Sequence, residues 1–161
     1  MSPQKSSVRV QREPFDPGKE LNSFLSETPH AGGIAVFIGQ MRDFRGPERA
    51  SGEPVSAMTL EHYPGMAERE LDALIDEAKL RWKLDNVCVI HRTGALLPSD
   101  AIVFVAAASA HRADALEACT FLIDWLKTKA PFWKLEETPG GEKWVEAHEG
   151  DDAAAARWAK K

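Results

Sequence analysis

Short stretches of the chain alternate between hydrophobic and polar residues, and this pattern predicts β-strands. Two further runs, residues 86–92 and 100–109, are rich in β-branched and other apolar residues, which is typical of buried strands. Near the C-terminus, PFWKLEE and KWVEA flank the turn-forming TPGGE and predict a hairpin. The remaining predicted strands are residues 8–12, 31–41 and 57–63.

Helical spacing of apolar residues predicts two long helices. The second covers roughly residues 110–129 and is ended by the proline that follows. A shorter helix begins after Asp16, which suits the N-cap position, with Pro17 as the first helical residue. The first long helix opens at Pro64, and its apolar positions are Leu71, Leu74, Ile75, Ala78 and Trp82.

The predicted order of elements is β-α-β-β-α-β-β-α-β-β, with a polar loop rich in Gly and Pro at residues 42–56. This order favours an α+β fold with a mixed, mostly antiparallel sheet, two long helices and a small additional β layer, similar to the α/β hammerhead. A chain of 161 residues fits one domain. We place that domain at residues 1–150. Residues 151–161 form either a short helix or a frayed tail.

The composition excludes some classes of protein. A net charge of −5 argues against a bulk nucleic-acid binder, which needs a surplus of Lys and Arg. Cys88 and Cys119 form no CxxC pair and lie among apolar neighbours, so we expect buried free thiols. The sequence has no apolar signal segment and no run of roughly 18 apolar residues that could span a membrane. We therefore expect a cytoplasmic protein with no membrane or nucleic-acid partner.

Familiar catalytic and metal-binding motifs are missing from the sequence. It contains no P-loop, no HExxH motif and no zinc-ligand spacing, so we expect no metal. No GxSxG elbow or Cys/His pairing marks a nucleophile. His62 and His91 also lack metal-ligand spacing, and we interpret each as a satisfied or surface histidine.

Three lysines crowd into DWLKTKAPFWKLEE among aromatic residues. On a helix, Lys127 shares an arc of about 60° with Leu116, Thr120 and Ile123, which predicts that it lies on the core-facing side at the last turn. Lys127 is then either a structural lysine that snorkels to solvent or a lysine that binds an anion. Lys129 points away, toward solvent.

Lys134 falls in a segment of period two, on the same face as Phe132 and Glu136. It either pairs with Glu136 on a solvated face or lies beside an aromatic wall near Lys127.

The other end of the second long helix offers a second basic group. Ser109 suits the N-cap and places His111 and Arg112 in the first turn, where free N–H groups favour a phosphate or a carboxylate. Alternatively, Asp114 and Glu117 only complement the helix dipole, and His111 is merely exposed. The loop after residue 41 adds two arginines that carry little weight alone, Arg42 and Arg45.

Several segments together resemble the large (catalytic) subunit of molybdopterin synthase. They are GGIAVFIGQMRD, MTLEHYPGM, VIHRTGALLPSDAIVFVAAASAHR, FLIDWLKTKAPFWKLE and GGEKWVEA, which cover most of residues 32–147 in the order of that family. LEHYPGM, SAHR and LKTKAPFWK are the most specific of these motifs.

The resemblance implies an activity and an assembly. The family converts cyclic pyranopterin monophosphate into molybdopterin by adding two dithiolene sulfurs, with no cofactor. The sulfur arrives as a thiocarboxylate on the C-terminal Gly-Gly of a small ubiquitin-like partner, whose tail enters the large subunit. The assembly is a heterotetramer built on a homodimer of large subunits. Residues 1–150 would then form a single catalytic domain, and 151–161 a C-terminal tail.

The resemblance also suggests site residues, position by position. The catalytic pair would be Lys127 and Lys134, which would hold the anionic thiocarboxylate, with Lys127 as proton donor and acceptor. Leu135 stands where the family carries a basic residue, and Gln40 stands where it carries a lysine. The substrate-binding residues would be Gln40, Met41, Arg42, His111, Arg112, Lys127, Lys134, Leu135 and Glu136, with Arg42, His111 and Arg112 on the phosphate.

Other functions stay open at this point. A non-catalytic module that binds a phosphorylated ligand or a partner's C-terminus would use the same basic residues. An enzyme that forms a Schiff base through Lys127 is a second alternative. An RNA-binding αβ domain is a third, although the acidic balance and the lack of a GxxG clamp disfavour it.

Overall fold

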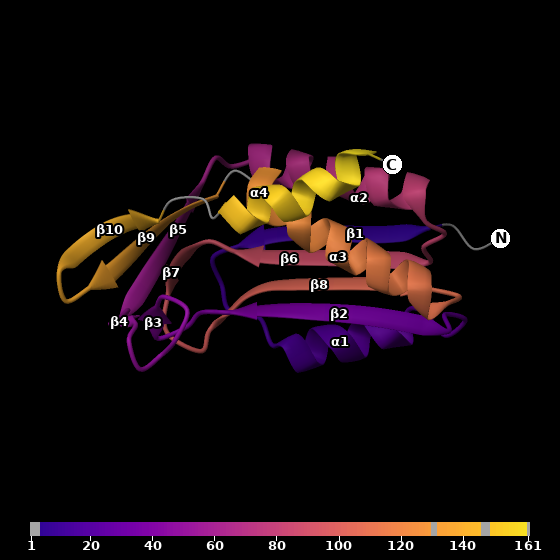
Figure 1. The fold of residues 1–161 in the computed structure, drawn as a ribbon. Coiled ribbons are helices and arrows are strands. Elements are labelled where there is room, and N and C mark those ends of the chain that lie inside the picture. Colours follow the sequence, from indigo (N-terminus) through magenta and orange to yellow (C-terminus); the bar gives the residue numbers. More distant parts are fainter. Residues whose placement is uncertain (1–3, 130–131, 146–148, 161) are drawn as a thin grey trace.

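The computed structural model describes residues 4–129, 132–145 and 149–160, which form two layers of helices around a twisted sheet, with a second sheet at one end (Figure 1). The strands are β1 Lys5–Gln11, β2 Gly33–Gln40, β3 Phe44–Arg45, β4 Glu53–Pro54, β5 Ala57–His62, β6 Asn86–Arg92, β7 Gly94–Leu96, β8 Ala101–Ser109, β9 Phe132–Thr138 and β10 Gly141–Val145. The helices are α1 Pro17–Ser26, α2 Met66–Arg81, α3 Arg112–Lys129 and α4 Glu149–Ala156, followed by the 3₁₀ turn η1 Arg157–Lys160.

The first sheet has the strand order β1-β6-β8-β2, and the second has the order β10-β9-β5-β7. Only β1 and β6 pair in parallel, and every other described pair is antiparallel. The predicted α+β class with a mostly antiparallel sheet is therefore confirmed, as is the additional β layer. The strands β3, β4 and β7 were not predicted, because two or three residues are too few to show a period.

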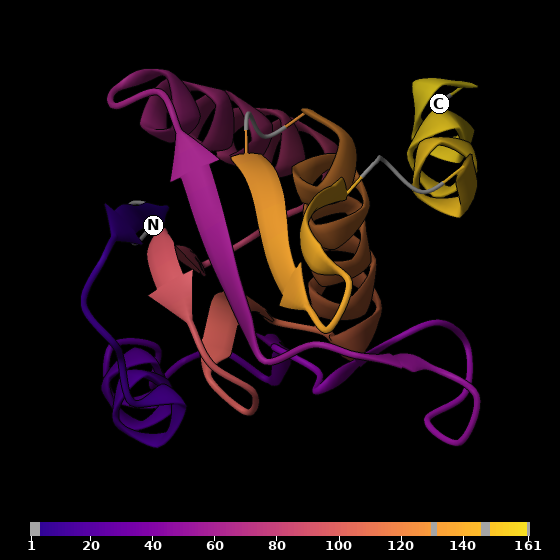
Figure 2. The same ribbon diagram turned by 90° about the vertical axis from the view of Figure 1, so that its left-hand side faces the viewer.

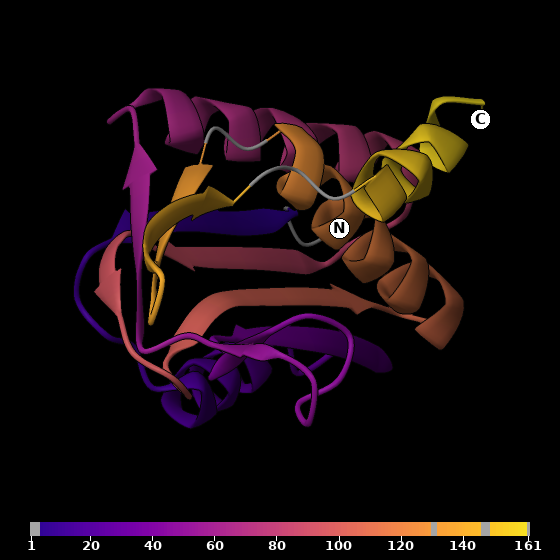
Figure 3. The same ribbon diagram turned by 60° about the vertical axis from the view of Figure 1, so that its left-hand side comes forward.

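Helices cover both faces of the first sheet (Figures 1 and 3). α2 and α3 pack on one face, where Leu71, Ile75, Val89, Val105 and Phe121 belong to one buried cluster. α1 packs on the other face through a second cluster that includes Phe24, Ile90 and Phe104. Burial of these apolar side chains is the main source of stability at about 25 cal/mol per Å².

The second sheet closes the end of the molecule at which β2 ends and β8 begins (Figure 2). Its own small core consists of Met41, Val55, Met58, Leu60 and Leu96, all at most 5% exposed. The chain crosses between the sheets at residue 93, since β6 lies in the first sheet and β7 in the second. This crossing brings the end of β6 close to β9.

The predicted helix start is confirmed for α1. The Asp16 carboxylate accepts hydrogen bonds from the backbone of Gly18 at 2.9 Å and of Lys19 at 3.2 Å, which satisfies N–H groups that the helix leaves free. α2 begins at Met66, two residues later than predicted. The apolar stripe expected on α2 is buried at Leu71, Leu74, Ile75 and Ala78.

The C-terminal residues form the short helix α4 and the turn η1 rather than a frayed tail. Trp158 is only 6% exposed, and its ring lies 5.7 Å from that of Phe121. Asp124 of α3 accepts hydrogen bonds from Arg157 Nη2 at 2.8 Å and from Trp158 Nε1 at 2.7 Å. These contacts hold the C-terminus against α3.

Candidate active site

Lys127 and Lys134 come from the last turn of α3 and from β9, and they lie at the same end of the molecule. Lys134 is half-buried and Lys127 is exposed. Burial lowers the pKa of the Lys134 ammonium, and the charge of Lys127 lowers it further, whereas Asp151 and Glu136 oppose the shift. Of the two alternatives for Lys134, the structure has the lysine near Lys127 rather than a solvated pair.

The prediction that Lys127 lies on the core-facing side of its helix is wrong. Leu116 on the same arc is 58% exposed, and Thr120 is exposed as well. The buried arc lies on the order of 100° further round, at Ala115, Ala118, Cys119, Phe121, Leu122 and Leu126. Small side chains fill much of that arc, so hydrophobic contrast along the sequence did not reveal it.

Three aromatic rings stack at the start of β9, the strand that carries Lys134. Phe132 is two residues earlier on the same face of β9. The ring of His91 stacks on Phe132 with centroids 3.8 Å apart and an angle of 8° between the planes. His62, the cross-strand neighbour of Phe132, stacks at 6.1 Å and 27°. Lys134 therefore follows this stack by two residues on the same face of β9, and its charge acts on the His91 ring.

His91 is buried, at 5% exposure, and its Nδ1 lies 2.8 Å from the carbonyl oxygen of Arg92. Burial lowers the pKa of His91 to about 4, and the charges of Lys134, His62 and Lys127 act in the same direction. His91 is thus a satisfied histidine, as one of the two sequence interpretations had it. Its ring is neutral at pH 7.

Glu136 holds the polar loop onto β9. Its side chain is 15% exposed, and Arg45 Nε lies 3.7 Å from Glu136 Oε2. That oxygen is buried and receives no hydrogen bond from the described part of the chain. In the same loop, Arg42 Nη1 donates to the carbonyl of Gly46 at 3.2 Å, and its guanidinium lies 4.8 Å from the ring of Phe44.

Leu135 lies on the opposite face of β9 from Lys134. It pairs with Thr59 on β5 and with Trp144 on β10, and it is half-buried. Its side chain therefore points away from the two lysines, which separates it from the rest of the expected site.

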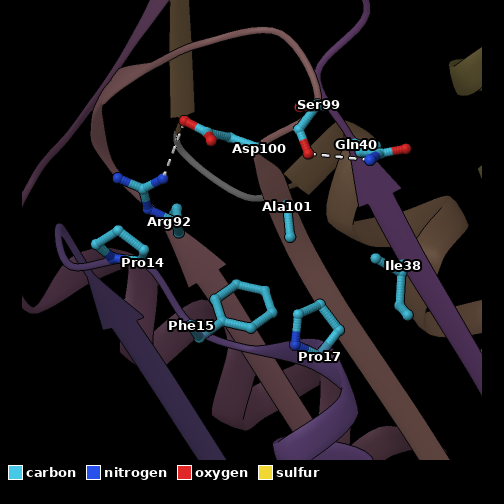
Figure 4. A pocket seen from close by; sticks show the side chains of 9 residues that line it. All are labelled: Pro14, Phe15, Pro17, Ile38, Gln40, Arg92, Ser99, Asp100 and Ala101. Atoms are coloured by element: carbon cyan, nitrogen blue, oxygen red, sulfur yellow. Dashed lines mark hydrogen bonds and ion pairs between the residues drawn. The ribbon is translucent and has the colours of Figure 1, made fainter.

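Met41 and Gln40 occupy different surroundings at the end of β2. Met41 is 5% exposed and packs in the core of the second sheet, so its side chain has a packing role. Gln40 donates through Nε2 to the carbonyl of Ser99 at 2.9 Å. It lines a cavity of about 320 Å³ that also contains Arg92 and Asp100, whose Nη1 and Oδ2 atoms lie 3.6 Å apart (Figure 4).

His111 and Arg112 lie at the start of α3, far from Lys127. Both side chains are exposed. Fifteen residues of helix separate Arg112 from Lys127, which is about 22 Å at 1.5 Å per residue. Within one chain, His111 and Arg112 therefore lie apart from Lys127.

Ser109 does not cap α3. Its side chain is buried, and its Oγ donates to the carbonyl of Lys83 at 2.7 Å. The helix begins at Arg112, and the carbonyl of His111 accepts the first helical bond, from Ala115. The backbone before and at the start of α3 lies close to Gly32 and Gly33. A Cβ on Gly32 would lie 2.2 Å from the Ala110 carbonyl oxygen, and one on Gly33 would lie 2.9 Å from the backbone of Arg112, so both positions require glycine.

The two cysteines are buried and free, as the sequence predicts. Burial raises the pKa of Cys119 to about 11 and also raises that of Cys88. Among the residues that the structure describes, no group of His, Cys, Asp or Glu side chains is placed to hold a metal ion. In the same ranges, no helix combines the length and apolar character needed to cross a lipid bilayer.

Comparison with known proteins decides the family. The family profile described as MoaE protein matches residues 10–129. The chain belongs to the MoaE family.

Relatives of known name or structure match nearly the whole chain. The Escherichia coli K12 protein named molybdopterin synthase catalytic subunit is 48% identical over 154 residues, which are 96% of this chain and 99% of that protein. The protein of the same name from Pseudomonas aeruginosa is 47% identical and covers 94% of this chain and 98% of its own length. The solved MoaE protein of Burkholderia ambifaria has a TM-score of 0.78 at 45% identity and covers 96% of this chain and 98% of its own. Membership in the MoaE family agrees with the resemblance seen in the sequence.

Sequence reasoning missed several features of this site. His91 was read only as a satisfied or surface residue, because nothing in the sequence pairs it with Phe132, 41 positions later. The buried Arg92 also went unnoticed, although the strand that carries it is buried at every position. Arg45 was treated as a solvated loop residue until the structure placed it against Glu136.

Proposed function

We propose that this chain is the catalytic subunit of a molybdopterin synthase, which transfers sulfur from a thiocarboxylated partner to cyclic pyranopterin monophosphate. Family membership supports the activity, since MoaE relatives 48% and 47% identical are named molybdopterin synthase catalytic subunit. The observation that carries the assignment of residues is the pair of lysines at one end of the molecule, one of them half-buried. A cationic, partly desolvated site binds an anionic thiocarboxylate more strongly than a fully solvated site does.

The two lysines have different roles in this proposal. Lys127 is exposed, so it is free to meet the incoming thiocarboxylate by charge. Lys134 carries the proton transfers, because burial and the neighbouring charge of Lys127 lower the pKa of its ammonium and thereby ease loss of a proton. This reverses the emphasis of the sequence interpretation, which gave proton transfer to Lys127.

The sulfur comes from outside the chain. Both thiols are buried and have raised pKa values, so neither is a ready thiolate nucleophile. A small ubiquitin-like subunit with a thiocarboxylated Gly-Gly terminus is the donor that the family resemblance implies. Free, unpaired thiols also suit the reducing cytoplasm in which we propose that the protein works.

A second copy of the chain completes the substrate site in this proposal. His111 and Arg112 form an exposed basic group at the start of α3, about 22 Å along the helix from Lys127. One chain cannot place both groups on one pterin, whereas a homodimer can bring the first group of one protomer to the lysines of the other. Arg42 belongs to the lysine end, because its loop is tied to β9 through Arg45 and Glu136.

Reconstitution tests the proposal. The purified chain is incubated with a thiocarboxylated small subunit and cyclic pyranopterin monophosphate, and the dithiolene product is measured after oxidation to a fluorescent pterin. We expect product only when all three components are present. Binding of the partner and the pterin without any dithiolene would instead identify a non-catalytic module.

A further inference from the structure

The buried ring of His91 joins the two sheets beside the candidate catalytic lysine. His91 lies on β6 of the first sheet, where it pairs with Val103 of β8 and with Val10 of β1. Phe132 lies at the start of β9 in the second sheet. Their stacked rings, 3.8 Å apart at their centroids, are thus a contact between sheets rather than within one.

One hydrogen bond fixes the plane and the tautomer of that ring. The carbonyl of Arg92 can only accept, so His91 Nδ1, 2.8 Å away, must carry the hydrogen. In the neutral ring Nε2 is then unprotonated. Three titratable groups act on the ring through their charge, Lys134, His62 and Lys127, and the backbone carbonyl of Arg92 accepts its hydrogen bond. A neutral ring avoids adding a further positive charge next to the two lysines.

The stack contacts the strand that carries Lys134. Phe132 and Lys134 are two residues apart on one face of β9, roughly 6.5 Å along the strand. Phe132 also stacks on His62 of β5, so the start of β9 is in contact with both sheets. Aromatic pairs of this kind contribute beyond their buried area and fix geometry.

We propose that His91 is a positioning residue for sulfur transfer: by stacking flat on Phe132 as an uncharged ring, it sets the place and the partial burial of the Lys134 ammonium. The proposal rests on the proposed function only for its activity readout. A ring that merely filled the core would affect stability but would leave the ionisation of Lys134 unchanged.

Two substitutions at His91 separate these possibilities. His91→Ala removes the stack, whereas His91→Phe keeps a flat, uncharged ring on Phe132. The matched control is Val89→Ala, which removes a buried side chain from the same strand and the same face, at 1% exposure, without touching Phe132. Each variant is compared with the wild-type chain for thermal stability before any other measurement.

The first readout is the ionisation of Lys134, measured by acetylation with an N-hydroxysuccinimide ester across a range of pH and peptide mass spectrometry. Lys143 of the same chain is the internal reference. In His91→Ala, Lys134 gains water, so we expect the midpoint of its labelling curve to move up by about half a pH unit or more. His91→Phe and Val89→Ala should leave that midpoint in place.

The second readout is dithiolene formation with the thiocarboxylated partner. We expect kcat to fall about tenfold or more in His91→Ala with little change in KM, because oriented groups and not binding are lost. His91→Phe should restore most of kcat. If His91→Ala does not fold, Phe132→Leu removes the flat ring from the other side and carries the same test.

The outcomes distinguish the two proposals. A folded His91→Ala protein with wild-type labelling of Lys134 and wild-type kcat would overturn the positioning role. Equal effects of Val89→Ala would overturn it as well, because general loosening of the core would then suffice. If the wild-type chain forms no dithiolene while His91→Ala still shifts the labelling of Lys134, the proposed function fails and the control of Lys134 by His91 stands.

Discussion

Lys127 on α3 and Lys134 on β9 lie close enough for the charge of one to lower the pKa of the other. Phe132, two residues before Lys134 on β9, stacks on the neutral ring of His91. The α3 helix and the β9–β10 hairpin, which are neighbours in sequence, thus fold back so that two ammonium groups share one site. Asp151 and Glu136 offset part of the repulsion between them, and a bound anion would offset more.

Removing the charge of Lys134 should stabilise the free chain. A lysine whose pKa is lowered on folding binds fewer protons in the folded than in the unfolded state, so it costs stability at every pH below its folded pKa. That cost disappears as the pH rises toward the pKa of an unfolded lysine. We expect Lys134→Met to gain roughly 0.5–2 kcal/mol of unfolding free energy at pH 7. Urea unfolding at pH 7 and pH 10.5 measures this, and a destabilised Lys134→Met at pH 7 would count against a desolvated ammonium.

Acid should weaken the fold through His91. The pKa of this residue is about 4 in the folded chain and 6.5 in its ordinary state, so the unfolded chain binds more protons between those values. Its contribution is therefore complete above pH 6.5 and falls as the pH drops toward 4, by up to roughly 3 kcal/mol. Urea unfolding of wild type and His91→Phe at pH 7.5 and pH 5 should show a smaller loss in the variant. Equal losses in both proteins would show that His91 is not the source of the acid sensitivity.

Sequence patterns predicted the elements whose signals are local. Asp16 before Pro17 marks a helix start by capping chemistry, and the stripe from Leu71 to Ala78 repeats at helical spacing. The face of α3 was misread because its buried arc contains Ala115, Ala118 and Cys119, which contrast little with the exposed Leu116. Small residues bury well against a sheet but leave a weak pattern.

The candidate site was only partly predictable for a different reason. Lys127 and Lys134 were singled out by their aromatic surroundings and by family resemblance, and both lie at one end of the molecule. The stack of His91 on Phe132 depends on how two sheets pack, which no periodicity records. The separation of Arg112 from Lys127, in contrast, follows from the length of α3, which the helical spacing predicted.

The ion pair of Arg45 with Glu136 should matter for substrate binding. It ties the loop that carries Arg42 to β9, and the Arg45 guanidinium faces a buried Glu136 oxygen that receives no hydrogen bond from the described residues. We expect Arg45→Ala to raise KM for the pterin several-fold while kcat changes less. The control is Arg49→Ala, because Arg49 pairs with Asp43 within the same loop and its side chain is 77% exposed. Equal kinetics in both variants would separate the ion pair from substrate binding.

The C-terminal turn should be part of the stable fold. Trp158 is 6% exposed among Phe121 and Trp82, and its indole donates to Asp124. Trp158→Ala should therefore cost about 3–5 kcal/mol of unfolding free energy. Leu80→Ala, at a side chain 89% exposed, is the control and should be nearly neutral. If urea unfolding showed Trp158→Ala to be as stable as Leu80→Ala, the C-terminal turn would contribute little to the stability of the fold.

A single-turnover assay of sulfur transfer tests the central role of Lys134 most directly. Lys134→Ala is mixed with saturating thiocarboxylated partner and cyclic pyranopterin monophosphate, next to Lys143→Ala from the same hairpin, whose ammonium pairs with Glu53 instead. If Lys134 transfers protons during the reaction, Lys134→Ala should bind the partner normally yet form dithiolene at least about 100-fold more slowly. Lys143→Ala should form dithiolene at close to the wild-type rate. A folded Lys134→Ala protein that forms dithiolene at the wild-type rate would contradict the account.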